Sequence, residues 1–438
     1  MDIPKPAELT VSTLGETRVV SPLVGRRSRF VDDDRGVFVH STTEEVPDGP
    51  APWFQAAGPR RDLFHDPSSV VCVVVTCGGL CPGLNDVIRS IVLTATHSYG
   101  VRKILGFRYG YSGLSSNALT PPYELTPAMV ENIHEQGGTI LASSRGPQDV
   151  GDMVDQLVRL NVGILFVIGG DGTLKGASAI RTEISRRGLA IGVIGIPKTI
   201  DNDLVWVQRT FGFTTATEAA GHAILCAHAE ARGAWNGVGL VKLMGRHAGF
   251  VAAHATLARA DVNFCLVPEV AFTLHGKGGF LEALEARLEA KHHAVVVAAE
   301  GAGQDILADR ERVTSRGGRD ASGNVKLEDV GLYLRDEIRA HFKAKSSPVD
   351  VKYIDPSYMI RSLPASALDS EFCLLLGQHA VHAGMAGKTD LMIGYWNRHF
   401  THVPLSLVVG RKRRMIVDGE VWPQVLEATG QPASLVGT

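Results

Sequence analysis

Residues 163–176 read GILFVIGGDGTLKG, and this stretch decides the fold class. Its first part, Gly163–Ile168, is a short continuous apolar run, which is typical of a strand buried on both faces. A glycine-rich turn over Gly169–Thr173 follows, and helical apolar spacing then extends over Leu174–Arg186. A buried strand that leads through a glycine turn into a helix indicates an α/β protein with a parallel sheet.

The same order of strand, turn and helix occurs on both sides of this stretch. The alternation predicts parallel sheets covered by helices on both faces, with ligands bound at the carboxyl ends of the strands. Further predicted strands are Val70–Thr76, Lys103–Phe107, Ile191–Ile196, Gly237–Leu243, Phe264–Val267, Ala294–Ala299 and Val349–Ile354. Further predicted helices are Asn85–Tyr99, Ala248–Ala258, Gly279–Ala290, Asp329–Phe342 and Asp369–Ala386.

Composition narrows the class of protein. The chain has 438 residues, 45% of them apolar, which suits two or three globular units. A formal net charge of −2 argues against a nucleic-acid partner and against a basic membrane-binding surface. No apolar run approaches the roughly 18 residues of a membrane span. Six sparse cysteines and the lack of a signal-peptide pattern predict a cytoplasmic protein.

The turn after Val70–Thr76 contains Gly78, Gly79 and Gly83. Glycines at this position let backbone amides approach a phosphate, and a helix amino terminus adds the positive end of its dipole. When this segment is considered alone, a tight turn without a ligand is the better interpretation. No Gly-Lys-Ser/Thr sequence follows, so the segment is not a Walker A loop.

The turn Gly169–Thr173 adds a carboxylate, Asp171, to such a glycine loop. An acid there could hold Mg²⁺ while the adjacent amides hold phosphate oxygens. An aspartate that only caps the following helix is the alternative interpretation.

The third strand end, Pro197–Asp203, carries Asp201 and Asp203 beside Lys198. Two carboxylates two residues apart at the end of a buried strand repel each other and lose solvent. Both effects raise a carboxyl pKa, which suits a general base. An Asx turn would account for Asn202 but not for two acids beside a lysine.

Later strand ends carry further polar groups. Met244-Gly245-Arg246 and Glu300-Gly301 follow two predicted strands, and Tyr358–Arg361 lies just after a third. Glycines that admit phosphate, acids that bind metal or take a proton, and arginines that neutralise oxyanions together favour phosphoryl transfer to a small hydroxylated molecule. The basic run Arg411–Arg414 is interpreted as a solvated face.

With these motifs taken together, the chain resembles the 6-phosphofructokinase family, and within it the plant and trypanosomatid ATP-dependent branch. The resemblance runs from about residue 58 to about residue 402. Thr199–Asp203 combined with Met244–Arg246 is its most specific part, because NAD kinases and lipid kinases share the Gly-Gly-Asp-Gly-Thr turn. The matching segments are Gly78–Arg89, Gly169–Gly176, Pro197–Asp203, Val241–Gly249, Ala299–Gln304 and Tyr353–Arg361.

The resemblance implies two three-layer, Rossmann-like α/β domains with mainly parallel sheets and an active site in the cleft between them. It also implies a homodimer or homotetramer. The implied domains are an N-terminal extension (1–68), a nucleotide domain (69–212, resuming at 369–402), a sugar-phosphate domain (213–368) and a C-terminal extension (403–438).

The resemblance also implies a role for each matching residue in a reaction of ATP with fructose 6-phosphate. Asp201 would take the proton of the sugar 1-hydroxyl, Asp171 would hold Mg²⁺, and Thr199, Asp203, Arg246 and Arg145 would assist catalysis. The implied ATP-binding residues are Gly79, Arg145, Gly146, Gly170, Asp171, Gly172 and Thr173. The implied sugar-binding residues are Thr199, Ile200, Asp201, Met244, Gly245, Arg246, Glu300, Tyr358, Met359, Ile360 and Arg361.

Two residues bear on the phosphoryl donor. The pyrophosphate-using branch has an aspartate where this chain has Gly172, and a carboxylate there would repel the α-phosphate of ATP. Lys198 is shared with that branch but is also usual in the plant-like ATP branch. We therefore expect ATP to be the donor, because Gly172 acts by directly leaving room for the nucleotide.

The chain departs from the short bacterial members at Ser370 and Gly237, where those enzymes have phosphate-binding arginines. Recognition of the 6-phosphate must therefore differ. The alternatives are a pyrophosphate-dependent phosphofructokinase, a relative of NAD or lipid kinases, and a non-catalytic sugar-phosphate sensor. A relative of NAD or lipid kinases would share Gly169–Thr173 but has no reason to carry Thr199–Asp203 with Met244–Arg246. A sensor would be expected to have degenerate acids, but Asp171, Asp201 and Asp203 are all present.

Overall fold

The structure is a computed structural model that describes residues 3–26, 29–40, 51–311, 318 and 326–438. Its internal contacts divide the chain into two compact units. Unit 1 consists of residues 1–199, 204–212 and 362–412, and unit 2 of residues 200–203, 213–361 and 413–438. The turn Ile200–Asp203 thus belongs to unit 2, although the strand before it belongs to unit 1.

Unit 1 is built on a nine-stranded sheet in the order β3-β4-β17-β16-β10-β9-β6-β7-β8. Its five central strands are parallel, and the strands toward both edges are antiparallel. The parallel strands are β6 (Val71–Thr76), β7 (Lys103–Phe107), β9 (Val162–Gly169), β10 (Gly192–Pro197) and β16 (Leu391–Trp396). The antiparallel strands are β3 (Gly36–Phe38), β4 (Trp53–Ala56), β8 (Tyr123–Glu124) and β17 (His399–Pro404).

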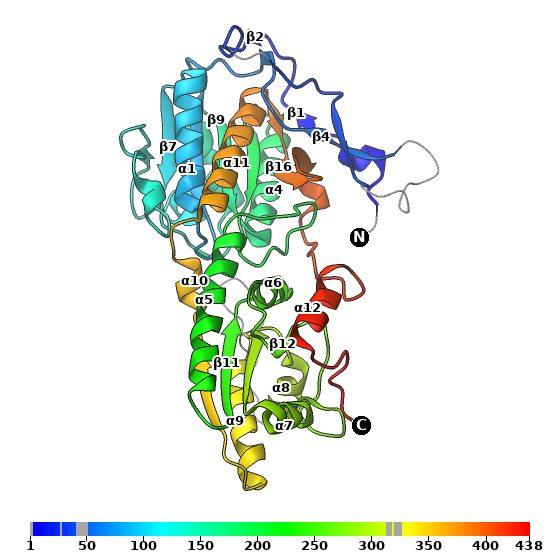
Figure 1. Ribbon diagram of the computed structural model, residues 1–438. Helices are drawn as coiled ribbons and strands as arrows, with labels where there is room; N and C mark the ends of the chain where they lie inside the picture. Colours follow the sequence, from blue (N-terminus) through cyan, green and yellow to red (C-terminus); the bar gives the residue numbers. More distant parts are fainter. Residues whose placement is uncertain (1–2, 27–28, 41–50, 312–317, 319–325) are drawn as a thin grey trace. The chain divides into compact units, whose positions relative to one another are not determined.

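Helices cover both faces of this sheet. The helices α1 (Leu84–Leu93) and α11 (Ala367–Met385) lie side by side on one face (Figure 1). The helices α3 (Val150–Arg159) and α4 (Asp171–Arg186) pack on the other face, where their apolar side chains join those of the strands in one core. The smaller helices are η1 (Pro6–Leu9), α2 (Gly110–Leu114), η4 (Ile133–Glu135), η5 (Leu405–Leu407) and the π-helix η3 (Thr94–Tyr99).

The described N-terminal residues form short strands that pair with distant parts of unit 1. Strand β1 (Ser12–Thr13) pairs with β15 (Lys388–Thr389), and β2 (Val19–Val20) pairs with β5 (Asp62–Leu63). Ion pairs reinforce this arrangement, because Asp33 binds Arg60 at 2.8 Å and Lys388 at 2.5 Å.

Unit 2 contains a four-stranded, fully parallel sheet in the order β12-β13-β11-β14. Helices α5 and α6 cover one face, and α7 and α9 cover the other with a second apolar core. The strands are β11 (Gly237–Leu243), β12 (Phe264–Leu266), β13 (His293–Ala299) and β14 (Asp350–Ile354). The helices are α5 (Phe213–Arg232), α6 (Phe250–Ala258), α7 (Phe280–Lys291), α8 (Gln304–Glu311), α9 (Val330–Ala344), α10 (Ser357–Arg361) and α12 (Val421–Thr429).

The α/β class and the predicted buried strands are confirmed, each strand to within one or two residues. Several features differ from the sequence prediction, and strand β16 and helix α3 are among the elements that were not predicted. The predicted helix Asn85–Tyr99 is α-helical only to Leu93 and continues as a π-helix. Helix α4 begins at Asp171 instead of Leu174. The long helix α5 was not predicted, because its many alanines weaken the contrast between its apolar and polar faces.

No helix in the described part of the chain is both long enough and apolar enough to cross a membrane. The six cysteines are all free thiols.

A buried histidine in unit 1 predicts acid sensitivity. Burial lowers the pKa of His65 to about 4. His65 therefore binds a proton near pH 6.5 in the unfolded chain but only near pH 4 in the folded protein. We expect the free energy of unfolding to fall as the pH drops through this range, by up to about 3 kcal/mol from this group.

Urea unfolding between pH 7 and pH 4 measures this loss. His65→Gln should flatten the dependence of the midpoint on pH, whereas His97→Gln, at an exposed position of the same unit, should leave it unchanged. An unchanged pH dependence in His65→Gln would refute the assignment.

Candidate active site

The carboxyl ends of three adjacent strands in unit 1 place the predicted nucleotide loops together. Thr76 of β6 is level with Ile168 of β9, and Gly169 is level with Pro197 of β10. The next residue, Lys198, donates its Nζ hydrogen to the carbonyl of Gly79 over 2.7 Å. Lys198 therefore holds the loop after β6 against the end of β10. The sequence had singled out this lysine only for its bearing on the choice of phosphoryl donor.

The segment that carries Arg145 and Gly146 lies beside the same loop. Gly78 N–H donates to the Ser144 carbonyl over 3.1 Å, and the Ser143 hydroxyl donates to the Gly78 carbonyl over 2.6 Å. Arg145 follows directly and is exposed. The two serines were missed in the sequence, where no strand or helix pattern marks them.

The Gly169–Thr173 motif forms the amino terminus of α4, so its amides include the first N–H groups of that helix, which have no acceptor within a helix. A Cβ atom on Gly169 would lie 2.4 Å from Thr173, so this glycine is required by packing. A Cβ on Gly172 would meet no atom within 4 Å. Packing within the protein therefore does not explain the glycine at position 172.

The acidic turn of residues 200–203 belongs to unit 2. Asn202 has the left-handed backbone φ of 53°, which asparagine tolerates better than most residues. Asn202 and Asp203 are buried, and Asp201 is half-buried. Thr199 lies in unit 1, where its carbonyl accepts a hydrogen bond of 2.7 Å from the Thr210 hydroxyl.

The loop Met244–Arg246 packs tightly against the loop that follows β13. Gly245 has a φ of 135°, which strongly favours glycine, and its carbonyl accepts a 3.1 Å hydrogen bond from Gly301 N–H. A Cβ on Gly301 would lie 2.1 Å from the Arg246 carbonyl oxygen. The two glycines therefore fix Arg246 and Glu300 at one edge of the unit 2 sheet.

Glu300 lies in a strongly charged environment. Burial raises its pKa, and the positive charges of Arg246 and Arg361 act in the opposite direction. Arg361 also stacks over the Tyr358 ring, with its guanidinium carbon 4.6 Å from the ring centroid. These four predicted sugar-binding residues therefore belong to one electrostatic cluster.

Helix α10 exposes only part of its predicted binding sequence. The side chains of Tyr358 and Met359 are largely exposed, whereas the side chain of Ile360 is buried. Ile360 is therefore placed to support the helix, and its side chain is not available to a ligand.

A partly buried ion network beside this cluster was missed in the sequence. The Nζ atom of Lys242 lies 2.7 Å from Asp329 and 2.8 Å from Asp355, and the Tyr353 hydroxyl donates to Asp329 over 3.1 Å. Burial alone would raise the pKa of Asp355, but the hydrogen bonds from Lys242 and Ser357 and the charge of Lys242 together lower it. The lysine lies within a predicted strand, so only the fold reveals its partners.

The structure gives physical reasons for both departures from the short bacterial enzymes. A Cβ on Gly237 would lie 2.0 Å from the Ala231 carbonyl oxygen, so no arginine fits there. The Ser370 hydroxyl donates to Asp86 over 2.6 Å and is engaged within unit 1.

The chemistry at Asp171 fits a magnesium–nucleotide complex. Within the described residues, no group of three or more His, Cys, Asp or Glu side chains could hold a metal by itself. Mg²⁺ often binds through one or two carboxylates together with substrate phosphates, and Asp171 stands at a helix amino terminus suited to those phosphates.

Two α/β units whose strand ends carry glycine loops, acids and arginines have the residues that a phosphotransferase needs. A family model described as phosphofructokinase matches residues 71–384. The chain belongs to the phosphofructokinase family.

Curated relatives agree with this membership. A protein of Borreliella burgdorferi named ATP-dependent 6-phosphofructokinase is 45% identical over 441 residues, which cover 98% of each chain. A protein of Trypanosoma brucei brucei with the same name is 48% identical over 378 residues, or 86% of this chain and 76% of that protein.

Solved structures show the same fold. A pyrophosphate-dependent phosphofructokinase from Marinobacter aquaeolei aligns with a TM-score of 0.67 at 21% identity, over 82% of this chain and 91% of that chain. A phosphofructokinase from Pichia pastoris aligns with a TM-score of 0.62 at 21% identity, over 77% of this chain and 35% of that chain.

Proposed function

We propose that the protein transfers the γ-phosphoryl group of ATP to the 1-hydroxyl of D-fructose 6-phosphate, forming fructose 1,6-bisphosphate and ADP in glycolysis. Relatives named ATP-dependent 6-phosphofructokinase, nearly half identical over almost the whole chain, support this reaction. The observation that carries the choice of donor is the open space at Gly172, beside the glycine loops of unit 1.

Unit 1 supplies the groups for the nucleotide. The backbone of Gly79 and Gly170–Thr173 would hold the phosphates, because glycines let the amides come close and the start of α4 presents its positive dipole end. Arg145 and Gly146, beside that loop, would add a charge and a further amide. Asp171 would hold a Mg²⁺ ion, which neutralises charge on the phosphate oxygens when it is bound.

Unit 2 supplies the groups for the sugar phosphate and the proton transfer. Asp201 acts as the general base on the 1-hydroxyl, and Asp203 positions the reacting groups together with Thr199 of unit 1. Arg246, together with Arg145, stabilises charge on the phosphoryl group in transit.

The remaining predicted groups of unit 2 hold the sugar. Glu300 and Arg361 flank the Arg246 loop, where their charges interact. Tyr358 lies under Arg361 and contributes an exposed aromatic face. Met244, Gly245 and Ile200 would contact the sugar mainly through backbone atoms, as would Met359 and Ile360 of α10.

A coupled assay for fructose 1,6-bisphosphate tests this function. The purified protein is given fructose 6-phosphate with either ATP or pyrophosphate, and we expect turnover with ATP and Mg²⁺. Faster turnover with pyrophosphate would favour the pyrophosphate-dependent alternative. If no product forms with either ATP or pyrophosphate, the result would instead favour a sugar-phosphate sensor or a relative of the NAD and lipid kinases.

We further propose a cytoplasmic homodimer or homotetramer. Six free thiols, five of them buried, support a reducing compartment, and the oligomer is proposed by analogy with the family. Light scattering of the purified protein gives the subunit number directly, and a monomeric mass would contradict the proposed assembly.

A further inference from the structure

A short C-terminal segment, residues 410–415, contacts acids from both sets of predicted site residues. We call it the C-terminal strap. Gly410 N–H donates to Oδ1 of Asp171 over 3.2 Å, within unit 1. Three residues later, Arg413 N–H donates to the Asp203 carbonyl over 2.8 Å, within unit 2. The strap therefore holds the backbone of the acidic turn and touches the predicted metal ligand.

Glu269 anchors the far end of the strap. Its Oε1 accepts a hydrogen bond from Met415 N–H over 3.0 Å. Both of its carboxylate oxygens also accept from Gly249 N–H, each over 3.0 Å. One half-buried carboxylate thus joins the strap to the residue that precedes helix α6.

Gly249 ties this anchor to the Arg246 loop, because only two residues separate them in the chain. A Cβ on Gly249 would lie 2.5 Å from Val267 and 3.0 Å from Oε2 of Glu269, so the close approach needs glycine. The strap makes a second contact with α6, where the Arg413 guanidinium lies 4.8 Å from the Phe250 ring centroid. Arg413 is therefore not part of a fully solvated basic face.

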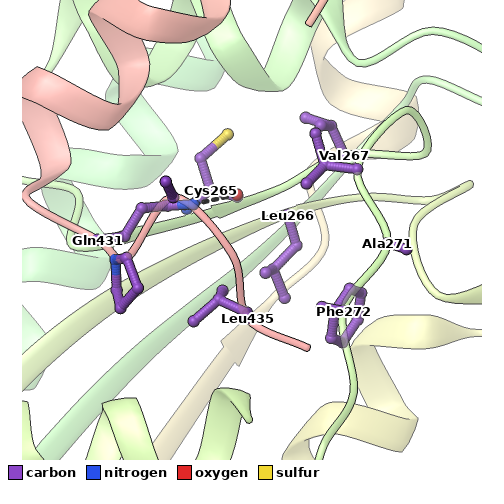
Figure 2. A pocket seen from close by; sticks show the side chains of 10 residues that line it. Cys265, Leu266, Val267, Ala271, Phe272, Gln431 and Leu435 are labelled. Atoms are coloured by element: carbon purple, nitrogen blue, oxygen red, sulfur yellow. Dashed lines mark hydrogen bonds between the residues drawn. The ribbon is translucent and has the colours of Figure 1, made fainter. Parts of the chain in front are cut away.

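The chain beyond the strap is bound to strand β12 of unit 2 and to the segment that follows this strand. Cys265 N–H donates to the Gln431 side-chain oxygen over 2.7 Å, and the Gln431 amide donates back to the Cys265 carbonyl over 3.3 Å (Figure 2). Leu435 forms a parallel bridge with Phe272. The cavity among these residues measures only about 10 Å³, the least that one water needs, so this contact is closely packed. The strap is thus held by a fixed segment of chain.

We propose that Glu269 is a positioning residue for the phosphoryl transfer, holding the Arg246 loop directly and the Asp201–Asp203 turn through the C-terminal strap. The proposal rests on the proposed function. Glu269 contacts neither proposed substrate. It accepts hydrogen bonds from the N–H groups of Gly249, near Arg246, and of Met415, in the strap that binds the turn carrying Asp201. Misplacement of such groups by about 1 Å can lower a rate by 10²-fold.

The test is a comparison of kcat with KM in Glu269→Ala and Glu269→Gln. In the alanine variant we expect kcat to fall by about 10-fold to 10²-fold, with KM for both substrates changed by less than about threefold. The glutamine variant keeps one acceptor oxygen at nearly the same place and should recover part of the lost kcat. Glu285→Ala is the matched control, because Glu285 pairs with Lys345 elsewhere in unit 2. It should lower the melting temperature without lowering kcat.

A second pair of variants isolates the strap itself. Arg413→Ala loses the guanidinium but keeps the N–H that binds the Asp203 carbonyl, whereas Arg413→Pro loses both. We expect the proline variant to be at least about tenfold slower than the alanine variant. Combined with Glu269→Ala, the proline variant should lose less activity than the product of the two single effects, because both changes break one connection.

Two results would overturn the proposal: a folded Glu269→Ala variant with normal kcat, or equal kcat in the two Arg413 variants. The Arg413 pair decides the question if Glu269→Ala does not fold. If the wild-type protein does not phosphorylate fructose 6-phosphate, the proposed function itself has failed. If the wild type is active and all these variants match it, only the role of Glu269 and the strap is lost.

Discussion

Asp201→Ala should lower kcat for the phosphorylation of fructose 6-phosphate by at least about 10²-fold, with only a modest change in KM. In the proposed mechanism the carboxylate takes the proton of the attacking hydroxyl in the transition state, so its loss would remove an interaction that the ground state does not use. Steady-state kinetics with saturating ATP and varied sugar phosphate measures both constants.

A comparison of two substitutions distinguishes the loss of proton transfer from the loss of side-chain size at residue 201. Asp201→Asn keeps the size of the side chain but cannot take a proton, so it should be nearly as slow as the alanine variant. Asp305→Asn, at an exposed carboxylate of the same unit, should leave kcat unchanged. Near-normal turnover in both Asp201 variants, with the fold intact, would reject this residue as the base.

Gly172→Asp should raise KM for ATP by about 10²-fold, because a like charge placed against the α-phosphate costs several kcal/mol and each 1.4 kcal/mol is a factor of ten in affinity. The variant should fold, since a Cβ at this position meets nothing within 4 Å. An aspartate in the first turn of α4 also suits the helix dipole, so stability should not fall.

The matched control for this variant is Gly172→Ala, which adds the Cβ without the charge and should bind ATP nearly as the wild type does. Initial rates with ATP and with pyrophosphate, measured in parallel, give the donor preference. We expect the aspartate variant to shift this preference toward pyrophosphate. An unchanged KM for ATP would show that Gly172 does not select the donor.

The sequence predicted every parallel strand of both sheets except β16 (Leu391–Trp396), because strands such as Val71–Thr76 and Gly237–Leu243 are continuous apolar runs. The antiparallel edge of unit 1 could not be found in this way. Strand β4 (Trp53–Ala56) pairs with β17, more than three hundred residues later in the chain, and four residues are too few for a periodic pattern. Such pairing depends on which partners the fold brings together.

The site was predictable where its residues follow strand ends, since parallel strands present those ends at one edge. That rule could also have found Glu269, three residues after β12, but nothing in its neighbourhood marks it as distinctive. The contacts of Gly410, Arg413 and Met415 could not be predicted. They are made by backbone N–H groups, which nearly every residue type has, so the residue type does not indicate the partner.

The interleaved path of the chain has a consequence for how the protein is made. The sheet of unit 1 is completed only by residues 391–404, which supply β16 and β17, and the acidic turn of unit 2 is held by residue 413. During synthesis from the amino terminus, neither unit can finish folding until nearly the whole chain has emerged from the ribosome. A chain that lacks residues 391–413 would therefore lack two strands of the unit 1 sheet and the hydrogen bond that holds the acidic turn of unit 2.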